Sequence, residues 1–314
     1  MRMKREYGLE QIEKDGGSLV TVGSFDGVHV GHQAIVQYLV RRAHERRCRS
    51  VVVSFEPHPR EVLTGEAVPL LSTIDERAGY LEALGLDRFI VLRFTRDFAA
   101  LPPEAFVRQI LVERIGLEEI VVGYDHGFGK GRQGNVGLLR RMGRQHGFTV
   151  DVISAQAVGR HVVSSTTIRR LLTEEGDVRG AVEMLGRPYV LSGAVVHGDG
   201  RGHTIGYPTA NIKVAHPRKV IPRRGVYAVQ THLAGEADRY GGMMNIGYRP
   251  TFDGNTRLHL EVHLFDFNRA IYNRHLHIAF LDRLRDEQKF DSIEALIAQL
   301  TEDERRSRGV LASG

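Results

Sequence analysis

Apolar residues recur along the chain with two different spacings, and the change from one to the other divides the sequence into halves. From Leu19 to about Gly186, short runs of β-branched residues alternate with segments whose apolar residues have helical spacing. Runs of the first kind are typical of strands. They predict five strands: Leu19–Val22, Ser50–Phe55, Arg88–Phe94, Glu119–Gly123 and Thr149–Ile153.

Segments with helical spacing lie between these strands. They predict the helices Ala34–Arg46, Asp75–Leu84, Pro103–Ile115 and Val136–His146, and two short helices, Ile168–Glu174 and Val178–Leu185, would close this half. Strands that alternate with helices usually pair in parallel, so we expect an α/β fold with a doubly wound, Rossmann-like parallel sheet. In such sheets ligands bind beyond the carboxyl ends of the strands.

The second half has a mainly β pattern. Short apolar runs are separated by Gly, Pro and Asn, which predicts a small closed barrel, and the segment Ser292–Leu300 with the charged residues after it predicts a terminal helix. The runs are Tyr189–Val196, Val226–Leu233, Gly242–Asn245, Arg257–Phe267 and His275–Leu281. The length of 314 residues also favours two domains, which we place at residues 1–184 and 185–314.

Composition excludes several classes of protein. Hydrophobic residues at 42% and charged residues at 26% are ordinary values for a folded chain. No stretch approaches the ~20 apolar residues of a membrane span, and Met1–Gly17 lacks the apolar core of a signal peptide. The single cysteine, Cys48, cannot form an internal disulfide, which fits a reducing compartment. We therefore expect a cytoplasmic protein without a membrane partner.

The formal charge of +5 indicates that anions are attracted, but it does not choose among them. Nucleotides, phosphates and nucleic acid all fit, and a solvated Arg-rich surface is the plainer interpretation. The sequence contains no helix-turn-helix, RNP-like or zinc-finger pattern, so we expect no nucleic-acid partner. The oligomeric state stays open.

A glycine-rich turn with two histidines follows the first predicted strand. Gly23 allows a tight turn, the next helix offers unpaired N–H groups, and His29 and His32 are spaced to face one anion. The motif predicts a triphosphate cradle whose imidazoles stabilise the charge that develops during in-line displacement. The alternatives are two helix-capping residues, or two ligands of a zinc site that lacks its others.

A hydroxyl-rich cluster follows the fifth predicted strand and opens a helix. Ser164, Ser165 and Thr166 could bind phosphate oxygens, and Arg169 could neutralise charge as pyrophosphate leaves. Taken alone, a Ser/Thr N-cap is the simpler explanation. Together with the histidine motif, phosphate binding is favoured.

The second half carries a different candidate site. A loop with Gly198 and Gly202 precedes Thr209 and Asn211, whose uncharged oxygens suit a Mg²⁺ bound chiefly through ATP phosphates. A plain hairpin turn is the alternative, and the loop is not a Walker P-loop because no Gly-Lys-Ser/Thr follows. Strand alternation places Glu261 off the apolar face, where it could take a proton from an attacking hydroxyl or be an exposed cross-strand charge.

These motifs together resemble the bacterial bifunctional riboflavin kinase/FMN adenylyltransferase family. In the first half the resemblance lies in Gly23–His32, Ser54–Arg60, Phe94–Phe98, Phe128–Arg132 and Ser164–Arg169. In the second half it lies in Leu185–Tyr189, Gly206–Asn211, Asn245–Phe252, Glu261–Phe267 and Arg285–Phe290.

The resemblance implies two activities that both need ATP and Mg²⁺. The second half, a six-stranded barrel, would phosphorylate riboflavin to FMN, and the first half would transfer AMP to FMN, giving FAD and pyrophosphate. The ATP residues of the first half would be Gly23, Phe25, Asp26, His29, His32, Asp125, Ser164, Ser165, Thr166 and Arg169. In the second half Gly198, Gly202, Thr209 and Asn211 would bind ATP, the last two also the metal, with Glu261 as catalytic base and Asn245, Arg285 and Glu287 at the flavin.

The segment after the fourth predicted strand departs from the family pattern. His126 and Gly127 stand where Phe and a basic residue are more usual, and a carboxylate at Asp125 would repel phosphate unless a metal or a base contact compensates. Tyr207 for Phe and Asn273 for Gly touch neither reaction. Two rival functions are a nucleotidyltransferase with another acceptor, which the second half argues against, and a basic flavin-binding module acting on nucleic acid.

Overall fold

The computed structural model describes most of the chain. The described residues are 2–14, 16–123, 127–129, 131, 133–154, 157–158, 161–198, 201–250 and 256–313. They form two compact units, Met1–Ser165 and Thr166–Gly314. Among the helices in these ranges, none combines the length and the apolar content needed to cross a membrane.

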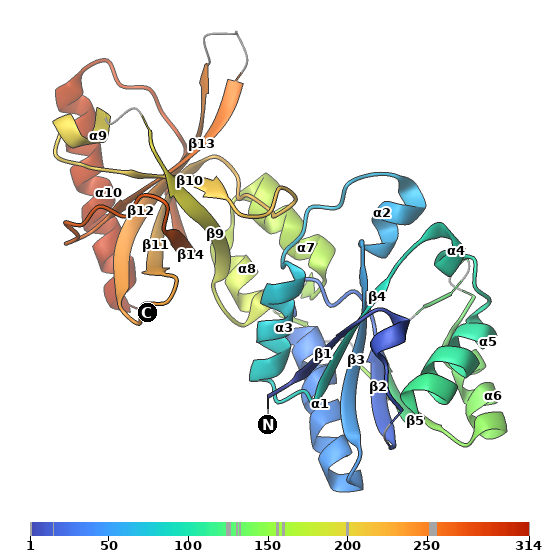
Figure 1. Ribbon diagram of the computed structural model, residues 1–314. Coiled ribbons are helices and arrows are strands. Elements are labelled where there is room, and N and C mark those ends of the chain that lie inside the picture. Colours follow the sequence, from blue (N-terminus) through green and yellow to red (C-terminus); the bar gives the residue numbers. More distant parts are fainter. Residues whose placement is uncertain are drawn as a thin grey trace. The chain divides into compact units, whose positions relative to one another are not determined.

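A parallel sheet forms the centre of the first unit (Figure 1). Within the described residues it has six strands: β1 Lys4–Tyr7, β2 Ser18–Val22, β3 Arg49–Glu56, β4 Arg88–Arg93, β5 Leu117–Gly123 and β6 Thr149–Ile153. Their order is β1-β4-β3-β2-β5-β6, and every neighbouring pair is parallel. From β2 the chain builds outward through β3 and β4, then returns to build through β5 and β6. The predicted doubly wound fold is confirmed, with its switch point between β2 and β5.

Two apolar cores lie on opposite faces of this sheet. Leu19 of β2 and Phe89 of β4 belong to a core with helices α1 (Val30–Arg46) and α3 (Ile74–Ala83). Their neighbours Val20 and Ile90 belong to the other core, with η2 (Phe106–Ile115) and α6 (Val136–His146). Successive strand residues face opposite sides, so a sheet covered on both faces needs continuous apolar runs. The remaining short elements are η1 Leu9–Gln11, α2 Pro59–Thr64, α4 Arg96–Ala99, α5 Pro103–Ala105, β7 Ala157–Val158 and β8 His161–Val162.

The edge strand β1 was absent from the predicted set, so the expectation of five strands was wrong. Its sequence is polar, and its inward residue is Glu6, which is 1% exposed. Glu6 accepts hydrogen bonds from Nε and Nη2 of Arg88 on β4, at 2.8 and 2.7 Å. A buried ion pair therefore replaces the apolar contact that marks the other strands.

The second unit contains a closed antiparallel barrel, as the resemblance implied (Figure 1). Its order is β10-β13-β12-β11-β14-β9. The six strands seen in the described residues are β9 Tyr189–Val196, β10 Ala210–Val214, β11 Gly225–Leu233, β12 Arg239–Pro250, β13 Thr256–Leu264 and β14 His275–Arg285. The hydrophobic pattern missed β10 because only Ile212 of this strand is buried.

Helices flank the barrel within the second unit. The terminal helix α10 spans Ile293–Ser313, and its charged second half continues as helix with ion pairs such as Glu302–Arg305. Helix α8, Val178–Leu185, buries one apolar side and packs against β14 and β9. Before it come α7 (Ser165–Arg170) and the π-helical turn η4 (Leu171–Glu175), and α9 spans Arg201–Thr204. The predicted boundary after residue 184 separates two modules of the sequence, not the two compact units, and it stays a prediction.

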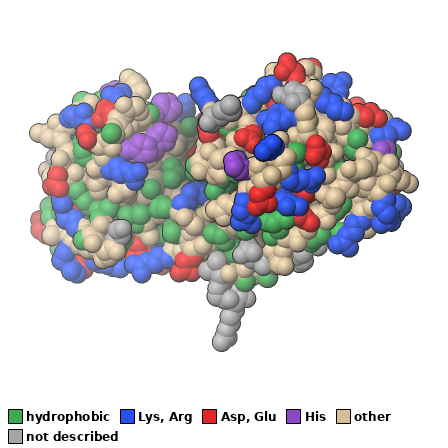
Figure 2. Space-filling view, turned by 90° about the horizontal axis from the view of Figure 1, so that it is seen from below, with side chains coloured by type: hydrophobic (Ala, Val, Ile, Leu, Met, Phe, Trp, Pro, Cys, Tyr) green, Lys and Arg blue, Asp and Glu red, His purple; other side chains and the backbone are tan. Residues whose placement is uncertain are grey.

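The surface carries both signs of charge. On the face in Figure 2, Lys and Arg side chains lie interspersed with Asp and Glu side chains. Exposed pairs include Arg42–Glu45 on α1 and Arg308–Asp266 beside α10. This surface is of the mixed, solvated kind.

Candidate active sites

His29 and His32 meet at the start of α1, beyond the carboxyl end of β2. His29 is the N-cap of α1, and its Nδ1 accepts a hydrogen bond from the backbone N–H of His32 at 3.3 Å. The two rings stack with centroids 3.6 Å apart and an interplanar angle of 14°. Helix capping therefore accounts for Nδ1 of His29, and it does not account for the other ring nitrogens of the two histidines. Because Nδ1 of His29 accepts, a neutral His29 carries its proton on Nε2 and can donate from there.

His32 has a ring suited to a neutral role. Burial lowers its pKa well below the usual value, and the charges of His29 and Arg77 lower it further. Its Nδ1 is buried without a hydrogen-bond partner among the described residues. A neutral imidazole has one donor and one acceptor, so a ligand with phosphate oxygens or hydroxyls could complete this site.

The loop between β2 and α1 is held in a strained form. Phe25 and Val28, both buried, have φ values of 49° and 40°, which non-glycine residues rarely adopt. The Phe25 ring lies 4.7 Å from that of His32, and a Cβ on Gly23 would lie 3.1 Å from the Phe25 ring. The structure thus brings the predicted residues Gly23 and Phe25 against the histidine pair.

Asp26 is the buried anchor of this loop. Its carboxylate accepts hydrogen bonds from the backbone N–H groups of Leu71 and Ser72 at 3.0 and 2.9 Å, and from Ser72 Oγ at 3.1 Å. Gly27 N–H donates to the same Ser72 Oγ at 2.7 Å. The side chain of Asp26 thus fixes the loop to the segment before α3.

Arg77 on α3 lies behind the loop and is 3% exposed. Its guanidinium donates to Ser54 Oγ and to the carbonyl of Ser72, both at 3.2 Å, and lies 3.5 Å from Asp26 Oδ1. Sequence reasoning missed Arg77 and Ser72, and the only signal was a charged residue on the apolar side of a predicted helix. A fixed positive charge behind the two imidazoles favours an anion in front of them.

Ser165 connects the hydroxyl-rich cluster to the loop. Ser165 Oγ donates to the carbonyl of Asp26 at 2.8 Å, and Ser164 precedes it, half-buried. Thr166 is exposed and Arg169 half-buried in α7, and both belong to the second unit. Asp125 and His126 lie outside the described residues.

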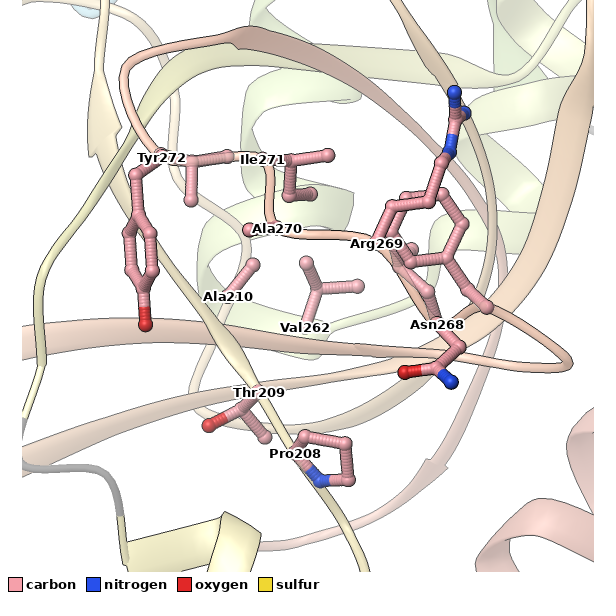
Figure 3. Close-up of a pocket in the computed structure, with 12 residues that line it drawn as sticks. Pro208, Thr209, Ala210, Val262, Asn268, Arg269, Ala270, Ile271 and Tyr272 are labelled. Atoms are coloured by element: carbon pink, nitrogen blue, oxygen red, sulfur yellow. The ribbon is translucent and has the colours of Figure 1, made fainter.

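Two pockets of about 350 Å³ each adjoin Thr209 in the second unit. The first, called the Tyr272 pocket, is shown in Figure 3 and has the His197 and Tyr272 rings stacked 4.0 Å apart at its edge. It is lined by Val195, Pro208, Thr209, Ala210, Val262, Leu264 and Phe267–Tyr272. The second, the Glu261 pocket, is lined by Gly202, Ile205, Tyr207, Thr209, Val226, Met243, Asn245, Glu261, His263, Arg285, Glu287, Gln288, Phe290, Leu296 and Leu300.

Glycines allow a close approach of backbone to side chains near Thr209. A Cβ on Gly198 would lie 2.0 Å from Asn211 Nδ2, and one on Gly202 would lie 2.2 Å from the Tyr207 carbonyl and 3.5 Å from Thr209 Oγ1. The predicted group of Gly198, Gly202, Thr209 and Asn211 is therefore brought together. The uncharged side-chain oxygens of Thr209 and Asn211, next to glycine backbone, suit a metal ion that keeps water and phosphate ligands. The described residues hold no cluster of three His, Cys, Asp or Glu side chains that could bind a metal alone.

Glu261 occupies the centre of a polar row across three strands. On β13 it pairs with Asn211 of β10 and with Asn245 of β12. Directly paired residues share a face of the sheet. Glu261 is half-buried and lines a pocket with Asn245, so the exposed cross-strand alternative does not describe its setting.

Arg285 lines the Glu261 pocket, but its guanidinium is bound to Asp303 of α10. Nε lies 3.0 Å from both carboxylate oxygens, and Nη2 donates to Oδ2 at 2.7 Å. Asp303 is fully buried, and Gln299 Nε2 also donates to it at 2.9 Å. Sequence reasoning missed Asp303, although it follows the apolar spacing of Leu296 and Leu300. Glu287 lies against Gly247, where a Cβ would be 2.0 Å from its Oε1.

Comparison with known families divides the chain in the same order as the two sites. The family model described as FAD synthetase matches residues 11–167, and the one described as riboflavin kinase matches residues 185–311. A curated protein of Listeria monocytogenes, named bifunctional riboflavin kinase/FMN adenylyltransferase, is 39% identical over 95% of this chain and 94% of its own. A protein of the same name from Pseudomonas fluorescens is 39% identical over 99% of this chain and 98% of its own.

A solved structure supports the fold over nearly the whole chain. The crystal structure described as a macrolide-efflux protein from Streptococcus pneumoniae has a TM-score of 0.88 and 31% identity, and covers 98% of this chain and 99% of that one. Its name describes transport, whereas both family models and the curated relatives name flavin-forming enzymes.

Proposed function

Because the chain belongs to the bifunctional riboflavin kinase/FMN adenylyltransferase family, we propose that it makes FMN and then FAD with ATP as co-substrate in both steps. Its riboflavin kinase domain follows its FAD synthetase domain. We assign the adenylyltransferase module to residues 1–184 and the kinase module to residues 185–314. The matched ranges 11–167 and 185–311 support this division.

In the kinase step, riboflavin binds in the Glu261 pocket and ATP in the Tyr272 pocket. The single observation that carries this assignment is the position of Glu261 between Asn211 and Asn245, in a pocket that shares Thr209 with its neighbour. Glu261 takes the proton of the primary hydroxyl as its oxygen attacks the γ-phosphorus. The bond from that phosphorus to its bridging oxygen breaks, and ADP leaves.

Thr209 and Asn211, beside the glycines, would hold Mg²⁺ together with ATP phosphates, which would supply most of its ligands. When bound, it neutralises phosphate charge. Asn245 and Glu287 contact the flavin from the pocket wall. The Arg285 guanidinium is already bound to Asp303, so Arg285 contributes to this wall as one member of that ion pair.

In the adenylyl step, a phosphate oxygen of FMN attacks the α-phosphorus of ATP, the bond to the bridging oxygen breaks, and pyrophosphate leaves. His29 donates from Nε2 to the phosphates, and neutral His32 completes the cradle. Arg77 supplies a fixed positive charge, and Asp26 keeps the loop in place. Ser164, Ser165, Thr166 and Arg169 clamp the leaving pyrophosphate, and Asp125 lies near the nucleotide.

Chromatography of the products from riboflavin, ATP and Mg²⁺ tests both steps on one polypeptide. Glu261→Gln should lower FMN formation at least about 100-fold and leave the conversion of added FMN to FAD intact. The double variant His29→Ala/His32→Ala should do the reverse. In each variant the retained activity shows that the substitution acts on one reaction and not on the whole chain. Unchanged FMN formation in Glu261→Gln would show that Glu261 is not the catalytic base. A wild-type chain that forms no flavin product would favour the hypothesis of a flavin-binding module that is not an enzyme.

A further inference from the structure

One wall of the Tyr272 pocket is the segment Phe267–Tyr272, which connects β13 to β14 (Figure 3). Beyond its far end the backbone is fixed to β9, because Asn273 N–H donates to the Val195 carbonyl and Val195 N–H donates to the Arg274 carbonyl, both at 2.9 Å. In the ranges that the structure covers, residues 267–270 make no such backbone bond to another element. Side chains must hold this half of the wall.

Arg269 fixes it by hydrogen bonds, beside Phe267, whose ring packs edge-on against that of Tyr240 with centroids 4.8 Å apart. Figure 3 shows the Arg269 guanidinium pointing away from Thr209, Ala210 and Val262. Nη2 donates to Glu236 Oε2 at 2.9 Å and to Tyr240 Oη at 3.0 Å. The guanidinium also lies 5.1 Å from the centre of the Phe267 ring and 5.9 Å from that of Tyr240. Such cation–π contacts restrain a planar group that is already hydrogen-bonded.

Glu236 accepts hydrogen bonds from two arginines of this connection, Arg269 and Arg274. It lies in the turn between β11 and β12, and its second oxygen, Oε1, accepts from Arg274 Nη2 at 2.9 Å. One carboxylate therefore bridges Arg269, in the middle of the wall, and Arg274, which is part of the backbone anchor. The hydrogen bond from Arg269, with a second from Arg274, holds the pKa of Glu236 below its usual value. The carboxylate is thus ionised wherever the two arginines are charged.

We propose that Glu236 is a positioning residue for the nucleotide of the kinase reaction, acting through Arg269 on the wall of the Tyr272 pocket. The inference rests on the proposed binding of ATP in that pocket. An arginine beside a nucleotide pocket would ordinarily be assigned to the phosphates. Here Nη2 donates to both Glu236 and Tyr240, and the guanidinium points away from Thr209 (Figure 3), so Arg269 shapes the wall and does not contact ATP.

Kinetics of FMN formation by the full chain test this role. In Glu236→Ala we expect the KM for ATP to rise about fivefold, the effect of losing two exposed ion pairs that order a segment. The KM for riboflavin, the kcat and the conversion of FMN to FAD should stay as in the wild type. Glu236→Gln keeps an acceptor for one arginine and should show a smaller rise. Glu302→Gln is the matched control, because it breaks an exposed Glu–Arg pair on α10 away from the pocket.

A double-mutant cycle separates positioning from direct contact. If Arg269 acts only through Glu236, then Arg269→Met should raise the KM for ATP as Glu236→Ala does, and the double variant should be no worse than either single one. Additive effects, or a lower KM for ATP in Glu236→Ala because a freed Arg269 binds phosphate, would overturn the inference. So would an unchanged KM in Glu236→Ala. A wild-type chain that forms no FMN would instead overturn the proposed function.

Discussion

Asp303 holds Arg285 at the edge of the Glu261 pocket, and replacing it measures how much the second unit depends on this buried pair. The carboxylate is fully buried and accepts three contacts from Arg285 and one from Gln299. The Arg285 side chain is 16% exposed, so water replaces little of what Asp303→Asn removes. Breaking a buried pair costs about 3–5 kcal/mol, and the retained amide oxygen favours the lower end, about 3 kcal/mol.

Calorimetry of the full chain is the assay, because the two units can melt separately. For a unit of this size each 1 kcal/mol lowers the melting temperature by about 2–4 °C, so Asp303→Asn should lower the transition of the second unit by about 6–12 °C. The transition of the first unit should not move. The freed Arg285 should also raise the KM for riboflavin.

Asp266→Asn is the matched control for burial. Arg308 on the same helix donates to both oxygens of Asp266, from Nη1 at 2.8 Å and from Nη2 at 3.0 Å, so this carboxylate is also bound by two nitrogens of one guanidinium. The Asp266 side chain is 78% exposed, whereas that of Asp303 is 0% exposed. Exposed pairs contribute little, so this variant should melt like the wild type. Equal shifts in the two variants would refute the argument that burial decides the effect.

Further variants test the first unit and α10. The pKa of His32 is lowered in the folded chain, so near pH 6.5 this side chain takes up a proton only in the unfolded chain. The free energy of unfolding should therefore fall as the pH drops below about 6.5. His32→Gln should lessen this fall in melting temperature, and an identical pH dependence would contradict the neutral assignment. Gly309→Ala in α10 should stabilise by about 0.5–1 kcal/mol, since no atom lies within 4 Å of its Cβ. Gly143→Ala in α6 should destabilise by about 1–3 kcal/mol, since its Cβ would lie 2.4 Å from the Phe148 carbonyl oxygen. Denaturant titration measures both, and stabilisation by both would show that helix propensity outweighs contact.

Sequence patterns found the strands that are buried on both faces. Val51–Val53 and Ile90–Leu92 are continuous apolar runs because successive residues enter different cores. The patterns missed β1 and β10, whose inward or site-facing residues include Glu6 and Asn211. A strand stabilised by an ion pair, or one that presents side chains to a site, lacks the alternation that marks strands.

The candidate sites were predicted by residue type, but their supports were not. Alternation placed Glu261 off the apolar face, and spacing placed His29 beside His32. Neither pattern indicated that Arg77 would lie behind the histidines or that Asp303 would bind Arg285. These partners are far apart in sequence, and a single sequence does not indicate which buried charges meet.

Helix α8 has a consequence for separating the two activities into independent proteins. The riboflavin kinase model begins at residue 185, the last residue of this helix. A fragment cut there would lose Val178, Ala181 and Met184, and would leave the part of β14 and β9 that they cover open to water. Such an exposed apolar patch promotes aggregation. A kinase fragment that begins at Thr166 keeps this cover, so its solubility should exceed that of a fragment trimmed to the sequence family.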